Sequence, residues 1–172
     1  MNNLKRFIPL LLLSGAALTA ACDDGELELD QRTATVGFET SRIEIEQSTE
    51  EQIPLVIRAS KGSMLKAYTV YVEVVDPEAW IGDVCTVANP VYKTADPENG
   101  DYTTVYTANM GEGTLKTGLL LTAGVHSSED RDRELTFRIV EDPLGGAYPN
   151  GNPYYRVGSQ RSIRVLLKKT EP

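Results

Sequence analysis

The stretch AYTVYVEVV, residues 67–75, decides the fold class because its apolar residues recur at every second position. In an extended chain, one face carries Tyr68, Val70, Val72 and Val74, and the other carries Thr69, Tyr71 and Glu73. This period of two, in β-branched and aromatic residues, is typical of a strand and does not fit a helix of period 3.6. Asp76-Pro77 then ends the run.

Similar short runs occur on both sides of this strand, and turn residues separate them. They are TATVGFE (33–39), RIEIEQ (42–47), QIPLVIRA (52–59), YTTVYTA (102–108), TLKTGLLLTA (114–123), ELTFRIVE (134–141), YYRVG (154–158) and SIRVLLKK (162–169). No segment has a convincing amphipathic helical pattern. The sequence therefore predicts an all-β fold, a single antiparallel immunoglobulin-like β-sandwich of about eight strands over residues 33–170.

Proline, glycine and asparagine residues in and between the runs give three local predictions. Pro54 cannot donate a ladder hydrogen bond, which favours an edge or strand-start position. NMGEG, residues 109–113, indicates a hairpin loop between the two runs that flank it. DPLGGAYPNGNP, residues 142–153, is so rich in Gly, Pro and Asn that we expect a surface loop.

The N-terminal segment has the order of a secretory signal peptide. Two basic residues precede an apolar run that is too short to span a bilayer, and small residues follow. Leu18-Thr19-Ala20-Ala21-Cys22 resembles the lipobox of bacterial lipoproteins, although that family usually has Leu where this chain has Thr19. The resemblance implies a signal peptide over 1–21 and acyl chains, palmitate among them, on Cys22. The alternative is an ordinary secreted protein cut after Ala20 or Ala21.

An acidic stretch follows Cys22 at once. Asp23, Asp24 and Glu26 resemble the export signal of surface lipoproteins from Bacteroidota-type bacteria. The resemblance implies a protein anchored in the outer membrane and displayed at the cell surface. Clustered like charges also suit a solvated tether, so residues 22–32 are predicted to link the lipid to the domain.

Charge and cysteine usage exclude several classes of function. The chain has 172 residues, 17 basic and 25 acidic, and the part after residue 21 has 15 basic and 25 acidic residues. Such an acidic surface disfavours nucleic acid as a partner. Cys85 is the only cysteine besides Cys22, so no disulfide is expected, and Cys85 is interpreted as a small buried apolar residue. With His126 as the single histidine and no phosphate-binding or zinc motif, we expect no enzyme and no required cofactor.

Four segments resemble a Calx-β domain, an immunoglobulin-like sandwich found in sodium–calcium exchangers, integrins and many bacterial surface proteins. They are VGFETSRIEIEQ (36–47), NGDYTTV (99–105), EDRDRELTFRIVEDPLGG (129–146) and VGSQRSIRVLLKK (157–169). The resemblance spans residues 35–168, nearly the whole domain, and implies the Calx-β strand order. Calcium-binding members carry paired aspartates before the acidic turn, where this chain has His126-Ser127-Ser128, and an acidic cluster after the last strand, where it has Lys168-Lys169.

A calcium site would need six to eight oxygen ligands gathered at one loop cluster. The residues that would contribute are Glu46, Asp101, Glu129, Asp130 and Asp132. The alternative is that these are solvated loop charges.

Aromatic residues in irregular segments indicate a second kind of site. A platform for sugar rings would form if these aromatic residues shared one rim of the sandwich. The candidates are Trp80, Tyr154 and Tyr155, and Tyr92 and Tyr148 also lie in or beside irregular segments. The alternative is core packing, with one residue of the Tyr154-Tyr155 pair inward and one outward. The sequence thus predicts a non-enzymatic surface lipoprotein acting as a binding or accessory module. It leaves open a glycan-binding accessory lipoprotein of a polysaccharide-uptake system, and an adhesion module with calcium.

Overall fold

The computed structural model describes residues 32–47, 52–60, 66–75, 85–95, 102–123 and 131–169. Regular structure in these ranges consists of strands. They are β1 (Ala34–Phe38), β2 (Arg42–Glu46), β3 (Gln52–Ala59), β4 (Tyr68–Val74), β5 (Cys85–Val87), β6 (Val91–Ala95), β7 (Tyr102–Met110), β8 (Lys116–Ala123), β9 (Arg133–Val140), β10 (Tyr155–Val157) and β11 (Ser162–Lys168). The part of the chain covered by these ranges has no helix long and apolar enough to cross a membrane.

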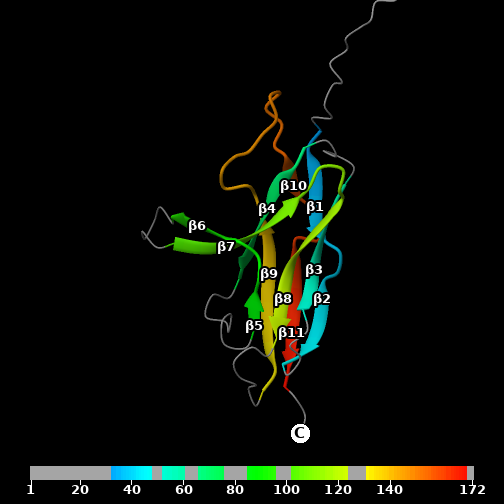
Figure 1. Cartoon of the computed structure of the whole chain (residues 1–172), viewed down its shortest axis with the longest axis vertical. Helices are drawn as coiled ribbons and strands as arrows, with labels where there is room; N and C mark the ends of the chain where they lie inside the picture. The colour runs from blue at the N-terminus through cyan, green and yellow to red at the C-terminus, as the bar shows by residue number, and fades with distance from the viewer. Residues whose placement is uncertain are drawn as a thin grey trace, which may run out of the picture.

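The strands form two sheets packed as a sandwich (Figure 1). One sheet has the order β10-β1-β3-β8-β5, and the other has the order β2-β11-β9-β4-β7-β6. The predicted all-β sandwich is therefore confirmed. The core lies between the sheets, because alternate residues of each strand point inward and are buried there.

The alternation seen in the sequence decides which residues form this core. In β9, Leu135, Phe137 and Ile139 are buried, while the residues between them are at least partly exposed. β4 follows the predicted pattern, since Tyr68, Val70 and Val72 are buried inward. Tyr71 is buried as well, although it lies on the outward face of β4, because the ring of Tyr92 packs edge-on against it at 5.6 Å.

The strand count and the strand directions differ from the prediction. The structure has eleven strands in the described ranges instead of about eight, and two of the pairings are parallel. The additional strands include β5 and β6, which match none of the runs recognised in the sequence. The parallel pairings arise because the chain changes sheets at residues 39–41 and again at 158–161. β1 pairs with β10 in one sheet, and β2 pairs with β11 in the other, with each pair running in the same direction.

The predicted hairpin around residues 109–113 is wrong. β7 pairs with β4 and β6, whereas β8 pairs with β3 and β5, so the connection passes from one sheet to the other. The Gly-containing turn reverses the chain, as the sequence indicates, and Gly113 takes a φ of 70° there. The reversal does not bring the two strands side by side in one sheet.

Asn89 joins the two sheets next to the β7–β8 connection, which we call the arch because it passes from one sheet to the other. Its Nδ2 donates to the carbonyl oxygens of Thr107 in β7, at 3.0 Å, and Gly118 in β8, at 3.1 Å. Its Oδ1 accepts a hydrogen bond of 2.7 Å from the backbone N–H of Leu120. One side chain thus satisfies three backbone groups that belong to different sheets.

Pro54 lies near the start of β3, as predicted. β3 is an inner strand of its sheet, but β1 pairs with it only along residues 57–59. On the β8 side, Pro54 is opposite Leu120. The missing N–H of the proline therefore costs no ladder hydrogen bond, because no β1 residue is paired with β3 at this level.

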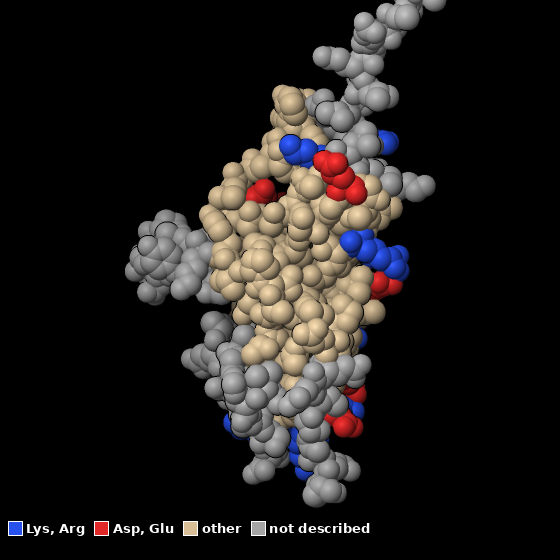
Figure 2. Space-filling model, in the orientation of Figure 1, with Lys and Arg blue, Asp and Glu red and all other residues tan. Residues whose placement is uncertain are grey.

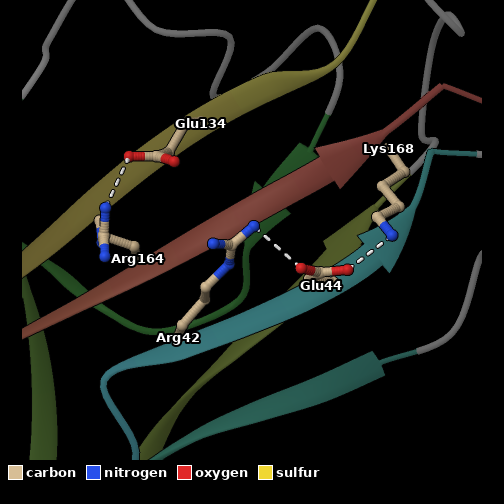
Figure 3. A network of polar contacts seen from close by, with 5 residues as sticks. All are labelled: Arg42, Glu44, Glu134, Arg164 and Lys168. Atoms are coloured by element: carbon tan, nitrogen blue, oxygen red, sulfur yellow. Dashed lines mark ion pairs between the residues drawn. The ribbon is translucent and has the colours of Figure 1, made fainter.

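Ion pairs cover the outward face of the six-stranded sheet near its β2 edge. Figure 3 shows Glu44 between Arg42, at 2.9 Å, and Lys168, at 2.6 Å. Arg164 and Glu134 lie 3.9 Å apart on the neighbouring strands. The hydrogen bond from Lys168 lowers the pKa of Glu44. Exposed pairs of this kind add little stability, but charges along an edge strand discourage pairing with another chain.

Candidate functional site

The β9–β10 loop, residues 141–154, is the most elaborate connection that the structure describes. Asp142 organises its first half, because its Oδ1 accepts the N–H of Leu144, at 2.8 Å, and its Oδ2 accepts the N–H of Gly146, at 3.0 Å. Ala147 and Pro153 then form a bridge that closes a small turn. Gly145 and Gly151 adopt φ values of 65° and 82°, which other residues rarely take. The surface loop predicted here is thus a specifically hydrogen-bonded structure.

Two tyrosines pack inside the β9–β10 loop. The rings of Tyr148 and Tyr154 meet edge-on, with centroids 4.9 Å apart, and Tyr148 is buried. The ammonium of Lys66 lies 5.6 Å from the centre of the Tyr154 ring. A Cβ on Gly146 would come within 2.8 Å of that ring, so this position has room only for glycine. Tyr154 is the half-buried aromatic of the loop, and its ring already has protein neighbours.

Tyr155 is not available as a sugar platform, so the prediction is wrong for this residue. Its side chain is 1% exposed, and its ring stacks on Tyr68 with centroids 5.9 Å apart. The hydroxyl donates to the carbonyl of Val140, at 2.8 Å, and accepts from the N–H of Tyr71, at 3.3 Å. Tyr155 belongs to β10 in one sheet, so its hydroxyl bridges β4 and β9 of the other sheet.

Replacement of Tyr155 by Phe should lower the free energy of unfolding by about 1–3 kcal/mol. The ring would remain, but a buried N–H and a buried carbonyl would lose their shared partner. Urea unfolding followed by circular dichroism measures the change. Tyr154→Phe is the matched control and should stay within about 0.5 kcal/mol of wild type. Equal stability of the two variants would contradict the role given to the Tyr155 hydroxyl.

Two of the five predicted calcium ligands lie in the described residues, beside the end of β11. Glu46 is the last residue of β2 and pairs with Lys168 in the sheet register. Asp132 precedes β9, and its Oδ1 accepts a hydrogen bond of 2.9 Å from the N–H of Lys169. Buried Gln47 holds this end together by donating to the carbonyl of Arg131, at 2.9 Å.

The calcium site nevertheless stays a prediction. No group of three or more His, Cys, Asp and Glu side chains that would suit a metal ion occurs in the residues described. Asp101, Glu129 and Asp130 fall outside the described residues. Near the two acids that are described, Lys168 and Lys169 bring positive charge, which disfavours a cation.

Cys85 is a buried apolar residue, as the sequence predicts. It is fully buried in the core at the start of β5. Burial raises the pKa of its thiol to about 12, so the thiol is protonated at neutral pH. A protonated, inaccessible sulfur is a poor nucleophile. His126, the only histidine, lies outside the described residues.

Several predicted site residues also lie outside the described residues. They are the lipidation residue Cys22, the export-signal residues Asp23, Asp24 and Glu26, and the aromatic Trp80. Sequence reasoning missed Asp142 and Lys66. An Asp that starts a Pro- and Gly-rich loop is a recognisable turn signal. The contact of Lys66 with Tyr154 has no local signal, since the two residues are far apart along the chain.

Comparison with known proteins identifies the fold. No family model matches the chain, and no curated protein matches it by sequence. Among solved structures, the apo form of the Calx CBD1 domain matches with a TM-score of 0.54 and 9% identity, over 81% of this chain and 99% of that domain. The CBD12 structure of CALX1.2 matches with a TM-score of 0.51 and 10% identity, over 78% of this chain and 44% of the longer one. At such low identity the likeness concerns the fold alone, and the chain has the fold of a Calx-β domain.

Proposed function

We propose that this protein is a non-enzymatic binding module, held in the outer membrane by acyl chains on Cys22 and displayed at the cell surface. The lipobox-like residues 18–22 and the acidic residues that follow support the anchor and the display. The observation that carries the binding role is the β9–β10 loop, which the Asp142 hydrogen bonds and the Ala147–Pro153 bridge organise at one end of the sandwich. The buried, protonated Cys85 supports a module without nucleophilic chemistry.

The entry point of the chain decides how such an anchor would orient the domain. The N–H of Ala34 donates to the carbonyl of Tyr154, at 3.1 Å, so β1 begins beside the β9–β10 loop. β11 ends near Glu46 and Asp132. An anchor at Cys22 would thus be connected to the domain at the end that carries the β9–β10 loop, opposite the Glu46 end. The eleven residues 22–32 would span at most roughly 40 Å when extended.

Labelling with radioactive palmitate in cells tests the anchor. The full chain should incorporate the label and sediment with outer membranes, and protease added to intact cells should digest the domain. Cys22→Ser should abolish labelling and release the protein from the membrane, because a thiol is needed to receive the diacylglycerol. Cys85→Ala, which changes the buried cysteine, should behave as the wild type. Palmitate retained by Cys22→Ser, or a domain that resists protease on intact cells, would contradict the proposal.

The two other functions left open by the sequence have weaker support. A glycan platform on the loop aromatics cannot include Tyr155, because this residue is buried in the core. Tyr154 already contacts Tyr148 and Lys66. An adhesion module with calcium rests on Glu46 and Asp132, which lie at one end of the sandwich beside two lysines.

A further inference from the structure

The outward face of the five-stranded sheet carries three cations in an otherwise acidic protein of net charge −8. Arg156 in β10 is paired in register with Thr35 in β1, and Arg58 in β3 is paired with Gly37, two positions along β1. Lys116 in β8 is directly opposite Arg58. All three side chains are exposed. They therefore form one basic group across four neighbouring strands, which we call the basic row.

Among the residues that the structure describes, one acidic side chain pairs with the basic row. Glu39 forms an ion pair with Arg58, and that contact lowers the pKa of Glu39, with a smaller contribution from Lys116. In the ranges the structure describes, no carboxylate forms an ion pair with Lys116 or Arg156. Like charges placed opposite each other, as in Arg58 and Lys116, destabilise a sheet. The row with Glu39 keeps a charge of +2.

A shallow hollow of about 260 Å³ lies beside Arg58, the middle residue of the basic row, whereas Lys116 and Arg156 are outside its lining. It is lined by residues of β1, β3 and the β10–β11 connection, namely Thr35, Gly37, Arg58, Ser60, Ser159 and Gln160, with apolar neighbours. Close packing of the backbones shapes its wall, since a Cβ on Gly158 would come within 2.9 Å of the Thr35 side chain. The hollow is thus built by β1, the end of β3 and one of the two segments that change sheets, residues 158–161.

The lining combines one cation with neutral polar groups. Ser60 accepts the N–H of Thr35 through its Oγ, at 2.8 Å, and its own hydroxyl proton can still be donated. Gln160 donates its Nε2 to the carbonyl of Ser162, at 2.7 Å, which leaves the carboxamide oxygen as an acceptor. Hydroxyl and amide groups of this kind exchange hydrogen bonds with the hydroxyls of a sugar, while the basic row attracts a negative charge.

From this arrangement we propose that the hollow binds a single saccharide unit that carries a carboxylate or a sulfate. The proposal names a ligand class for the binding module and rests on its being a binder, but it does not depend on the lipid anchor. The volume is below that of the pockets that hold drug-sized ligands, and it suits one sugar ring. The charged end of the ring would lie toward Arg58, the cation in the lining, and its hydroxyls toward Ser60, Ser159 and Gln160. Lys116 and Arg156, on the strands to either side, would add a longer-range attraction.

The backbone around the hollow favours a sugar over an acidic peptide. Peptides commonly bind by adding a strand to a free sheet edge. β1 is paired on both sides, with β10 and with β3, so its backbone groups are already used. Figure 2 shows that the charged side chains on the visible face lie toward its margins and leave the middle uncharged. The uncharged middle of that face offers no attraction for an anion.

NMR titration of the ¹⁵N-labelled full chain in detergent tests the proposal. The probes are glucuronic acid and glucose 6-sulfate, with glucose as the neutral counterpart, sodium sulfate as a free anion and triglutamate as an acidic peptide. At least one anionic sugar should shift the amides of Thr35, Gly37 and residues 158–160, and glucose should bind less tightly. The two anionic sugars distinguish a carboxylate from a sulfate as the recognised group.

Matched variants test which charged side chains contribute to binding of the anionic sugar. Lys116→Gln with Arg156→Gln should weaken the binding of the anionic sugar roughly fivefold or more. Arg42→Gln with Arg164→Gln removes two cations from the opposite sheet and should leave binding within about twofold. Glu39→Gln should strengthen binding, because it removes the carboxylate that repels the ligand.

Four results would overturn the proposal. They are binding of glucose as tight as that of the anionic sugars, unchanged binding in the Lys116–Arg156 variant, sulfate alone binding as well as the sugar sulfate, and triglutamate binding best. The titration uses purified protein, whereas palmitate labelling uses cells. A titration without the expected shifts would therefore not contradict the proposal of a lipid anchor. Absence of palmitate labelling would likewise not contradict the proposal that the hollow binds an anionic sugar.

Discussion

Between pH 9 and pH 12 the free energy of unfolding is expected to fall by several kcal/mol. Burial raises the pKa of the Cys85 thiol from its ordinary 9.0 to about 12, and burial raises that of Tyr68 from 10.0 to about 12. Burial also raises the pKa of Tyr155. Each of these groups is kept neutral by the fold, while in the unfolded chain it ionises at its ordinary pKa.

The sign follows from proton binding. Below pH 9 both states hold these protons, and the stabilisation is fully present. Above pH 9 for Cys85, and above pH 10 for Tyr68, the unfolded chain releases protons that the folded chain keeps. Each group then lowers stability by about 1.4 kcal/mol per pH unit until the folded pKa is reached.

Urea unfolding at intervals from pH 8 to pH 12 measures this loss. Cys85→Ala should be less stable at pH 8, but its decline should begin near pH 10 instead of pH 9, because the tyrosines then titrate first. The difference in stability between the two proteins should therefore narrow as the pH rises above 9. Near-ultraviolet circular dichroism at pH 8 shows whether the variant keeps native packing. A wild-type midpoint that stays constant up to pH 11 would contradict the prediction, as would the same onset in both proteins.

Replacement of Asn89 by Ala should lower the free energy of unfolding by about 2–4 kcal/mol. The change removes three hydrogen bonds, one to Thr107 in the six-stranded sheet and two to Gly118 and Leu120 in the five-stranded sheet. The N–H of Leu120 and the two carbonyls would be left to find water in a partly buried place. Because the bonds join both sheets, the loss should affect the whole domain in one transition.

Asn109→Ala is the matched control for Asn89. Asn109 is an exposed residue of β7, on the outward face of its sheet, so its removal should change stability by less than about 0.5 kcal/mol. Chemical denaturation of both variants beside the wild type gives the comparison. If both substitutions lower the free energy of unfolding by the same amount, the bridging role given to Asn89 is wrong.

Strands with a clear alternation could be predicted from the sequence, and the shortest strands could not. β4 and β9 show apolar residues at every second position over seven or eight residues, which specifies both the strand and its buried face. β5 has three residues, too few for a period to be recognised, and β10, equally short, is recognisable only as part of the longer run 154–158. Their places are set by partners far along the chain, β8 and β1.

Contacts over long sequence separations also limited prediction of the arch and the aromatic residues. The residues around 109–113 specify a reversal, but Asn89 supplies the bonds that hold β7 and β8 in different sheets. For the pair Tyr154-Tyr155, alternation predicts that one ring points inward without saying which. Tyr68 decides the matter, because its ring stacks on that of Tyr155. A site made from such contacts has no local signature.

The parallel pairing of β2 with β11 has a consequence for the order in which the protein folds. Ile43 pairs with Val165, so the contact closes a loop of about 120 residues, and β11 comes after all the other described strands along the chain. Loops of this length close late and slow the folding of β proteins. Until β11 arrives, β2 has no partner in its sheet, and β9 has a partner only on its β4 side. A nascent chain therefore cannot complete the six-stranded sheet before β11 is available, and loss of β11 would leave β2 without a partner in that sheet.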